Sequence, residues 1–282
     1  MKLALLGATG GVGREVLSQA VVAGHAVTAV VRNPAKLPTH VDVAQQDFAN
    51  PNNEVLADAL RDADAVISAV GPHRAAQAGI VAPATAAIAH AMDCAGIRRL
   101  VVISAAPVGV VPSTHRPQPP RYDPGDDLLM RYLLSPLIRR LFDRHYTDLA
   151  AMEDLLRDGS LDWTAIRPPR LTNGPLTGTY RTAIDRNVRH GLTISRPDVA
   201  HLMLTVLRQP ETVRHSVGVA YWVGARESRQ RKLRGRVEIG DLRSAQRVKA
   251  PRRRCPQNPK GAHHGIHQVR PVHLPRRRHR GA

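Results

Sequence analysis

The chain has 282 residues, of which 43% are hydrophobic, enough for a buried core in one large or two small domains. No stretch of 18 residues is both apolar and uncharged, and the initial run LALL is too short for a signal segment, so we expect a cytoplasmic protein without a membrane span. The formal net charge of +18 would indicate nucleic-acid binding if it were spread along the whole chain.

The positive charge is instead concentrated at the C-terminal end. After residue 224, 18 Lys and Arg side chains accompany only three acidic ones, whereas the first 224 residues carry 23 basic and 20 acidic side chains. We therefore predict one folded domain over residues 1–224 and a separate basic tail over residues 225–282.

Apolar runs alternate with helical patterns through the first half of the chain. Strands separated by helices pair in parallel through crossover connections, so this order predicts an α/β fold. We expect a Rossmann-type doubly wound parallel sheet with helices on both faces. The predicted strands cover residues 3–7, 25–32, 41–46, 64–71 and 98–104, and the predicted helices cover residues 11–23, 52–63 and 81–96, the last ending at a glycine C-cap.

The second half of the chain is less regular, and we expect small substrate-side elements near residues 107–145 and 168–195. Three acidic residues on the second of two expected helices are assigned to its solvated face; they are Asp148, Glu153 and Asp154. The expected elements are a proline-rich loop over residues 107–127, helices at 128–142 and 146–159, a strand at 161–167, an extended loop to 175, a helix capped by Ser195, and a last strand at 216–223.

The motif GATGGVG, residues 7–13, joins the first predicted strand to the first predicted helix. Its glycines Gly7, Gly10 and Gly13 allow positive φ, close approach of a ligand and tight packing of the helix on the sheet, and the helix N-terminus attracts phosphate. A simple flexible turn is the alternative, but the surrounding strands and helices favour dinucleotide binding. The pyrophosphate is expected against Thr9, Gly10, Gly11 and Val12.

The end of the second predicted strand carries Arg32 where an acidic residue would bind a ribose 2′-hydroxyl. A guanidinium there can hold a 2′-phosphate through paired hydrogen bonds, and Arg14 and Lys36 could add positive charge. We therefore predict that NADP(H) is preferred over NAD(H). Arg32 could alternatively be a solvated residue at a strand end.

Several segments resemble the atypical short-chain dehydrogenase/reductases, and most closely the branch that holds NmrA-like proteins and biliverdin-reductase-B or flavin-reductase-like proteins. The resemblance covers residues 1–223 and leaves the tail unmatched. It rests on GATGGVGREV, VVRNPAKL, QDF at 46–48, ISAVGP at 67–72, VVISA at 101–105 and LDWTAIRPPRLTNGP at 161–175.

The resemblance implies positions for further cofactor-binding residues. Phe48, Ala69 and Val70 could equally be core residues. By the resemblance, Asp47 and Phe48 would lie at the adenine, Ala69, Val70 and Gly71 along the adenosine ribose, and Ser104 and Pro168 near the nicotinamide.

Ser104 and Tyr146 are the candidate catalytic residues. Reductases of this superfamily usually protonate the substrate with a tyrosine whose pKa is lowered by a lysine four residues later. Here the residue four positions after Tyr146 is Ala150, so that cation is missing. Ser104 could instead only bind backbone or cofactor, and Tyr146 could only pack a helix face.

Two functions remain open on the sequence. The chain could be an oxidoreductase that transfers a hydride from NADPH to a small planar or carbonyl substrate, or an NmrA-like sensor that binds NADP(H) without turnover. We expect a small-molecule substrate, a monomer or homodimer, and no metal site, since Cys94 and Cys255 match no ligand spacing.

The basic tail contains PRRRC at 251–255, HHGIH at 263–267 and PRRRHR at 275–280, but no aromatic side chain. Without aromatic residues for base stacking, it could bind nucleic acid only non-specifically. The loss of hydrophobic patterning after residue 223 predicts disorder, and a shifted reading frame would explain it.

Overall fold

The computed structural model describes residues 1–222 except 39–40, 73–78 and 125–134. For residues 135–143 it describes the backbone but not the side chains. The elements described below belong to one unit of the chain, Met1–Leu233, and a second unit comprises Arg234–Ala282. The predicted tail over residues 225–282 therefore lies outside the described residues.

The main sheet has eight strands in the order β3-β2-β1-β4-β5-β6-β10-β8. Seven of them are parallel, and only β8, at one edge, runs antiparallel to its neighbour β10. This topology confirms the predicted Rossmann-type α/β fold. The strand bounds are β1 Lys2–Leu6, β2 Ala26–Val31, β3 Asp42–Gln45, β4 Ala65–Ser68, β5 Arg99–Ile103, β6 Asp162–Arg167, β8 Arg181–Ile184 and β10 His215–Ala220.

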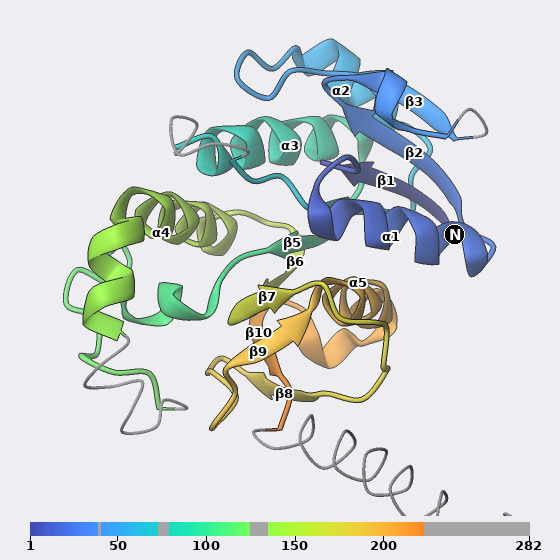
Figure 1. Cartoon of the computed structure of the whole chain (residues 1–282). Helices are drawn as coiled ribbons and strands as arrows, with labels where there is room; N and C mark the ends of the chain where they lie inside the picture. Colours follow the sequence, from blue (N-terminus) through green and yellow to red (C-terminus); the bar gives the residue numbers. More distant parts are fainter. Residues whose placement is uncertain (39–40, 73–78, 125–134, 223–282) are drawn as a thin grey trace, which may run out of the picture. The chain divides into compact units, whose positions relative to one another are not determined.

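Helices cover both faces of this sheet (Figure 1). Two helices pack together on one face, namely α1 Gly11–Val22 and α5 Arg196–Thr205. Three others pack side by side on the opposite face, namely α2 Asn53–Leu60, α3 Val81–Ala95 and α4 Ser135–Asp158. The core accordingly forms two apolar clusters, one between the sheet and each helix layer, as the alternation of strands and helices requires.

Capping residues mark the C-terminus of α3 and the N-terminus of α5, as predicted. Gly96 follows α3 with φ of +70°, a left-handed conformation that glycine adopts without steric cost. Ser195 caps α5, because its hydroxyl accepts a hydrogen bond from the Asp198 amide at 3.2 Å. Both caps were recognisable from neighbouring residues alone.

The second half differs from the sequence prediction in three places. A single helix, α4, replaces the two expected helices over the part of that segment that is described, because polar residues near 143–145 continue a helix as well as they break one. The predicted loop at 107–127 begins with the 3₁₀ helix η3, Ala106–Val110. The loop after β6 contains β7, Arg170–Thr172, which pairs with β9, Thr193–Ser195.

The assignment of three acidic residues to a solvated helix face is wrong. Glu153 is fully buried, and Asp154 and Asp148 are only 5% and 7% exposed. Buried apolar residues of α4 recur every four positions at Met152 and Leu156, so the acids share the face that packs against the molecule. Each acid has donors there that compensate its burial.

Asp148 shows how this compensation works. Its carboxylate accepts hydrogen bonds from the amides of Gly79, Val81 and Ala82 at 3.1, 2.8 and 2.9 Å. These are amides at the N-terminus of α3, which has no side-chain cap of its own. An acid on α4 therefore caps α3 and fixes α4 beside it.

Candidate functional site

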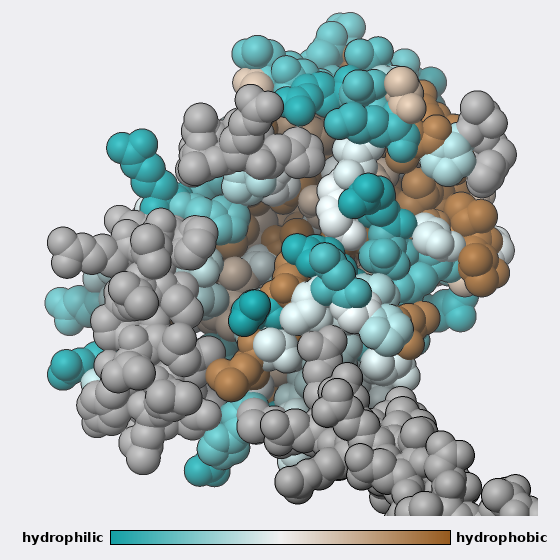
Figure 2. Space-filling view, in the orientation of Figure 1, coloured by the Kyte–Doolittle hydropathy of each residue, from teal (hydrophilic) through white to brown (hydrophobic). Residues whose placement is uncertain are grey.

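A cleft of about 430 Å³ lies at the carboxyl ends of the parallel strands, the usual place for a ligand in such a sheet. Figure 2 shows apolar surface in the hollow of this face, with hydrophilic residues around it. The cleft brings together every predicted cofactor-binding and catalytic residue except Gly13. The predicted residues that line it are Gly7, Thr9, Gly10, Gly11, Val12, Arg32, Asp47, Phe48, Ala69, Val70, Gly71, Ser104, Tyr146 and Pro168.

The glycines of the β1–α1 turn allow backbones to approach closely. Gly7 has φ of +77°, and a Cβ atom there would lie 2.7 Å from the Ala69 carbonyl oxygen at the end of β4. A Cβ atom on Gly13 would lie 2.2 Å from the Gly7 carbonyl oxygen. Gly13 is thus a packing residue that seats α1 on the turn, which explains why it does not line the cleft.

The N-terminus of α1 faces this cleft, and no side chain of the first turn neutralises the partial positive charge at that end of the helix. Gly10 is the N-cap and provides no side-chain hydrogen bond, and the first turn contains no acidic residue. The first amides and the positive end of the helix dipole are therefore suited to an anion. The Arg196 side chain adds a cation, because it passes over Gly11 and is held by Asn173 Oδ1 at 2.5 Å.

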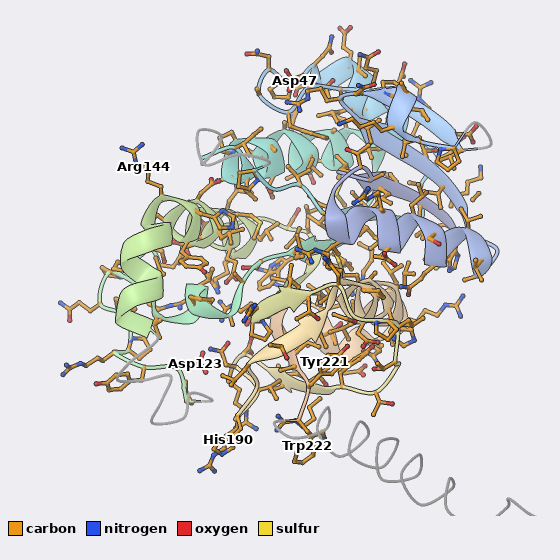
Figure 3. All side chains as sticks on the ribbon, in the orientation of Figure 1. Asp47, Asp123, Arg144, His190, Tyr221 and Trp222 are labelled. Carbon is orange, nitrogen blue, oxygen red and sulfur yellow. The ribbon has the colours of Figure 1, made fainter. Side chains whose placement is uncertain are left out.

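One end of the cleft is formed by the residues after β2 and β3. Arg32 is exposed, and its carbonyl oxygen accepts a hydrogen bond from the Gln45 side chain at 3.2 Å. Asp47, labelled beside α2 in Figure 3, accepts a bond from the Ala49 amide at 3.1 Å, which shapes the turn. Phe48 is only 8% exposed and belongs both to the cleft wall and to the core.

The opposite end of the cleft is formed by the residues after β5 and β6. The Ser104 amide donates to the Ile166 carbonyl oxygen at 2.7 Å, and the Ala106 amide donates to the Pro168 carbonyl oxygen at 2.9 Å. These bonds hold the two strand ends together beyond the sheet. Ser104 and Pro168 therefore share one wall of the cleft.

Behind Ser104 lies a buried charged network centred on Glu153. Glu153 Oε1 accepts hydrogen bonds from Ser104 Oγ at 2.7 Å and from Arg167 Nε at 2.8 Å. Glu153 Oε2 accepts bonds from Arg167 Nη2 and, at 3.0 Å, from Arg157 Nη2. Burial alone would raise the pKa of Glu153, but the charge and hydrogen bonds of Arg167, together with Ser104 and Arg157, outweigh it and hold that pKa below its usual range.

This network defines what the Ser104 hydroxyl can do. An ionised carboxylate only accepts hydrogen bonds, so the Ser104 proton points toward Glu153. The lone pairs of the hydroxyl remain for a donor in the cleft, such as an amide N–H. Ser104 is therefore arranged to orient a ligand rather than to donate a proton to it.

Two side chains of α4 line the cleft near Ser104, and both can donate a hydrogen bond. Tyr146 is half-buried against the core, and burial raises the pKa of its hydroxyl, so it stays protonated at neutral pH. Burial lowers the pKa of His145, which keeps its ring neutral, and His145 Nδ1 is buried without a hydrogen-bond partner among the described residues. The described residues of the cleft include no lysine.

Sequence reasoning missed two polar residues of this cleft, His145 and Arg196. His145 precedes Tyr146, and its position on the cleft side of α4 depends on how that helix packs. Arg196 is the first residue of α5, and only the packing of α5 on α1 brings it to the glycine turn. The missed apolar residues that line the cleft are Val31, Pro72, Ile80, Ile103, Ala105, Leu149, Pro169 and Leu171.

Comparison with known proteins gives a consistent result. A family model described as NAD(P)H-binding matches residues 7–210, which includes the glycine turn and all the helices named above. The uncharacterised protein YwnB of Bacillus subtilis is 29% identical over an alignment of 224 residues. The match covers 75% of this chain and 94% of YwnB.

Solved structures share the fold. A protein of Burkholderia pseudomallei described as exported is 27% identical, with a TM-score of 0.62, over 78% of this chain and all of that one. A short-chain dehydrogenase/reductase of Veillonella parvula in complex with NADP is 19% identical, with a TM-score of 0.59, over 78% of this chain and 94% of that one, and shows the fold alone.

The part of the chain that the structure describes lacks two kinds of feature. Its helices include none with the length and apolar character needed to cross a bilayer. The same residues hold no group of three or more His, Cys, Asp or Glu side chains arranged for a metal ion.

Proposed function

Because this chain belongs to the NAD(P)H-binding family, we propose that it is an NADPH-dependent oxidoreductase that transfers a hydride to a small planar or carbonyl-bearing substrate. The observation that carries the proposal is the single cleft that joins Arg32, the α1 N-terminus, and the wall formed by Ser104, Tyr146 and Pro168.

The residues of the cleft fit such a cofactor in size and charge. The turn at Gly10 and Gly11 offers backbone amides for the pyrophosphate, with Arg196 as an additional cation. Arg32 would hold the ribose 2′-phosphate, with Asp47 and Phe48 at the adenine. These groups bind and orient, and the bound cofactor supplies a hydride.

Preference for NADPH over NADH can be tested at Arg32. We expect isothermal calorimetry of the intact chain to give tighter binding of NADPH, and Arg32→Gln to reduce the difference roughly tenfold, the value of one charge-assisted hydrogen bond. Arg170→Gln, at an exposed position in β7, is the matched control and should keep the difference. Equal affinities for the two nucleotides in the unmodified chain would refute the preference.

The proposed reaction requires little chemistry from the side chains of the protein. Hydride addition leaves negative charge on the substrate, and a proton must follow to complete the reduction. Tyr146 carries a hydroxyl proton at that end of the cleft and the neutral ring of His145 carries one N–H, whereas the Ser104 proton is held by Glu153. We assign Ser104 to positioning, Tyr146 to proton donation and His145 to a hydrogen bond on the developing negative charge, with water replacing the proton of Tyr146 afterwards.

The proton donors can be separated from the binding residues by kinetics. Oxidation of NADPH would be followed with flavin, quinone and biliverdin acceptors. Where turnover occurs, His145→Gln or Tyr146→Phe should lower kcat about a hundredfold at unchanged NADPH affinity. Arg144→Gln is the control, because Arg144 is exposed on the same helix and points away from the molecule in Figure 3. Unchanged kcat in both variants would exclude these two donors.

A second function, an NADP(H) sensor without turnover, is favoured by one observation. Burial raises the pKa of Tyr146, and the described cleft has no lysine that would lower it, so the site lacks the tuned acid of a typical reductase. Tight NADPH binding together with no oxidation of NADPH by any acceptor would favour the sensor.

For the location and assembly of the protein, we propose the cytoplasm and a monomer or homodimer. Cys94 is an exposed free thiol, which suits a reducing compartment. Cell fractionation and sedimentation velocity would test these two proposals.

A further inference from the structure

A second cavity, of about 520 Å³, lies on the other side of the Glu153 network from the cofactor cleft. It lies between η3, the loop at 116–124, the end of α4, and strands β6 and β10, and it has no described lining residue in common with the cofactor cleft. In Figure 3, Asp123 of this cavity and Asp47 of the cofactor cleft appear at well-separated places on the molecule.

Four arginines line this cavity, and two of them form no direct ion pair with an acidic side chain in the part of the chain that the structure describes. Arg157 and Arg167 bind Glu153. Arg116, in contrast, donates to the carbonyl oxygens of Gly109 at 2.5 Å and Val108 at 3.3 Å.

Among the described residues, Arg214 likewise donates to carbonyl oxygens, those of Gly159 at 3.0 Å and Arg157 at 2.9 Å. Carbonyl groups orient a guanidinium but do not neutralise it, and each guanidinium has five N–H donors. Arg116 and Arg214 therefore bring positive charge that no direct ion pair within the described residues neutralises, together with spare donors, to the cavity.

The two carboxylates that also line the cavity are occupied by neighbouring donors. Asp185 binds His215 Nδ1 at 2.5 Å and the Ser216 amide at 3.0 Å. Asp123 Oδ1 accepts a hydrogen bond from the Asn187 amide at 2.8 Å. The two acids fix the walls and offset part of the positive charge, and the four arginines of the lining still outnumber them.

Trp163 on β6 also lines the cavity. Its side chain is 3% exposed and belongs to the apolar core, and its indole Nε1 atom is buried with no hydrogen-bond partner among the described residues. Because that atom is not accessible from the cavity, Trp163 is a fluorescent reporter in the cavity wall rather than a contact to a ligand.

We propose that this cavity is a second binding site, and that it takes the oxyanion group, phosphate or carboxylate, of a small metabolite. Arg116 and Arg214 provide the positive charge and the hydrogen-bond donors. Guanidinium groups bind both oxyanions through paired hydrogen bonds. The site does not depend on the function proposed for the cofactor cleft.

The test uses Trp163 as the reporter. The chain has two tryptophans, so Trp222→Phe leaves Trp163 as the only source of indole fluorescence. Inorganic phosphate and citrate would be titrated separately into this full-length variant at constant ionic strength, with sodium chloride as the blank. We expect a saturable change in Trp163 emission with at least one of the two, and which of them binds identifies the oxyanion.

Variants locate the binding. In the Trp222→Phe background, Arg214→Gln, at an exposed side chain that should not affect folding, and Arg116→Gln should each weaken the response about tenfold or more. Arg32→Gln and Arg196→Gln should each leave the response unchanged, because phosphate bound in the cofactor cleft would depend on Arg32 or Arg196. A response equal to that of chloride, or one that survives both Arg116→Gln and Arg214→Gln, would overturn the proposal.

Discussion

Replacing Glu153 by glutamine tests the buried network most directly. The substitution keeps the size of the side chain but removes the charge that faces Arg167, whose side chain is only 4% exposed. Removing one member of such a buried pair usually costs 3–5 kcal/mol. Glutamine can still accept one hydrogen bond, so we expect a loss of about 3 kcal/mol in the free energy of unfolding at pH 7.

Urea denaturation of the full-length chain would measure this loss. Asp158→Asn is the matched control on the same helix, because Asp158 is 66% exposed where it binds His115 at 2.6 Å. An exposed pair contributes about 1 kcal/mol or less, so the control should stay close to the unmodified protein. A loss below about 1 kcal/mol for Glu153→Gln would refute the network as a stabilising unit.

The difference in free energy of unfolding between the unmodified protein and Glu153→Gln should depend on pH, which provides an internal check. The pKa of Glu153 is lower in the folded than in the unfolded protein, where a glutamate titrates near about 4.3. The stabilisation is therefore complete above about pH 4.3 and is lost as the pH falls through the lower folded value. The gap between the unmodified protein and Glu153→Gln should narrow below about pH 4, and a constant gap would contradict the assignment.

Three further predictions concern the glycine turn, the cofactor cleft and α3. Gly13→Ala would shift the glycine turn by about 1 Å and should weaken NADPH binding, measured by calorimetry, roughly a hundredfold. Gly159→Ala, where a Cβ atom meets nothing closer than 3.4 Å, is the control and should leave NADPH binding unchanged. Arg196→Gln should weaken NADPH and NADH about equally, by roughly tenfold each, unlike Arg32→Gln. Asp148→Ala should lower the free energy of unfolding in urea by about 1–2 kcal/mol, because the N-terminus of α3 loses its cap, and an unchanged value would refute that role.

The features that sequence reasoning predicted well are those carried by neighbouring residues. Alternating strands and helices, the glycine spacing of the β1–α1 turn, the cap at Ser195 and the left-handed Gly96 all depend on a few positions of backbone preference or side-chain period. These local constraints, with the known handedness of crossovers, were enough to define the sheet and its ligand-binding edge.

The acidic residues of α4 show where that reasoning ends. Glu153 is 49 positions from Ser104 and 14 from Arg167, and no local pattern distinguishes an acid that meets a buried arginine from one that meets water. No local pattern predicts that Arg196 lies beside Gly11. Nor does one predict the short strands β7 and β9, which are stabilised by pairing with each other.

The sequence by itself thus determined the sheet, the glycine turn between β1 and α1 and the cation at the end of β2. Only the tertiary structure decided that Ser104 gives its proton to a buried carboxylate, that His145 lines the cleft and that a second basic cavity exists. The physical reason is that backbone preferences act over a few residues, whereas the cost of burying a charge is set by which distant groups the fold brings to it.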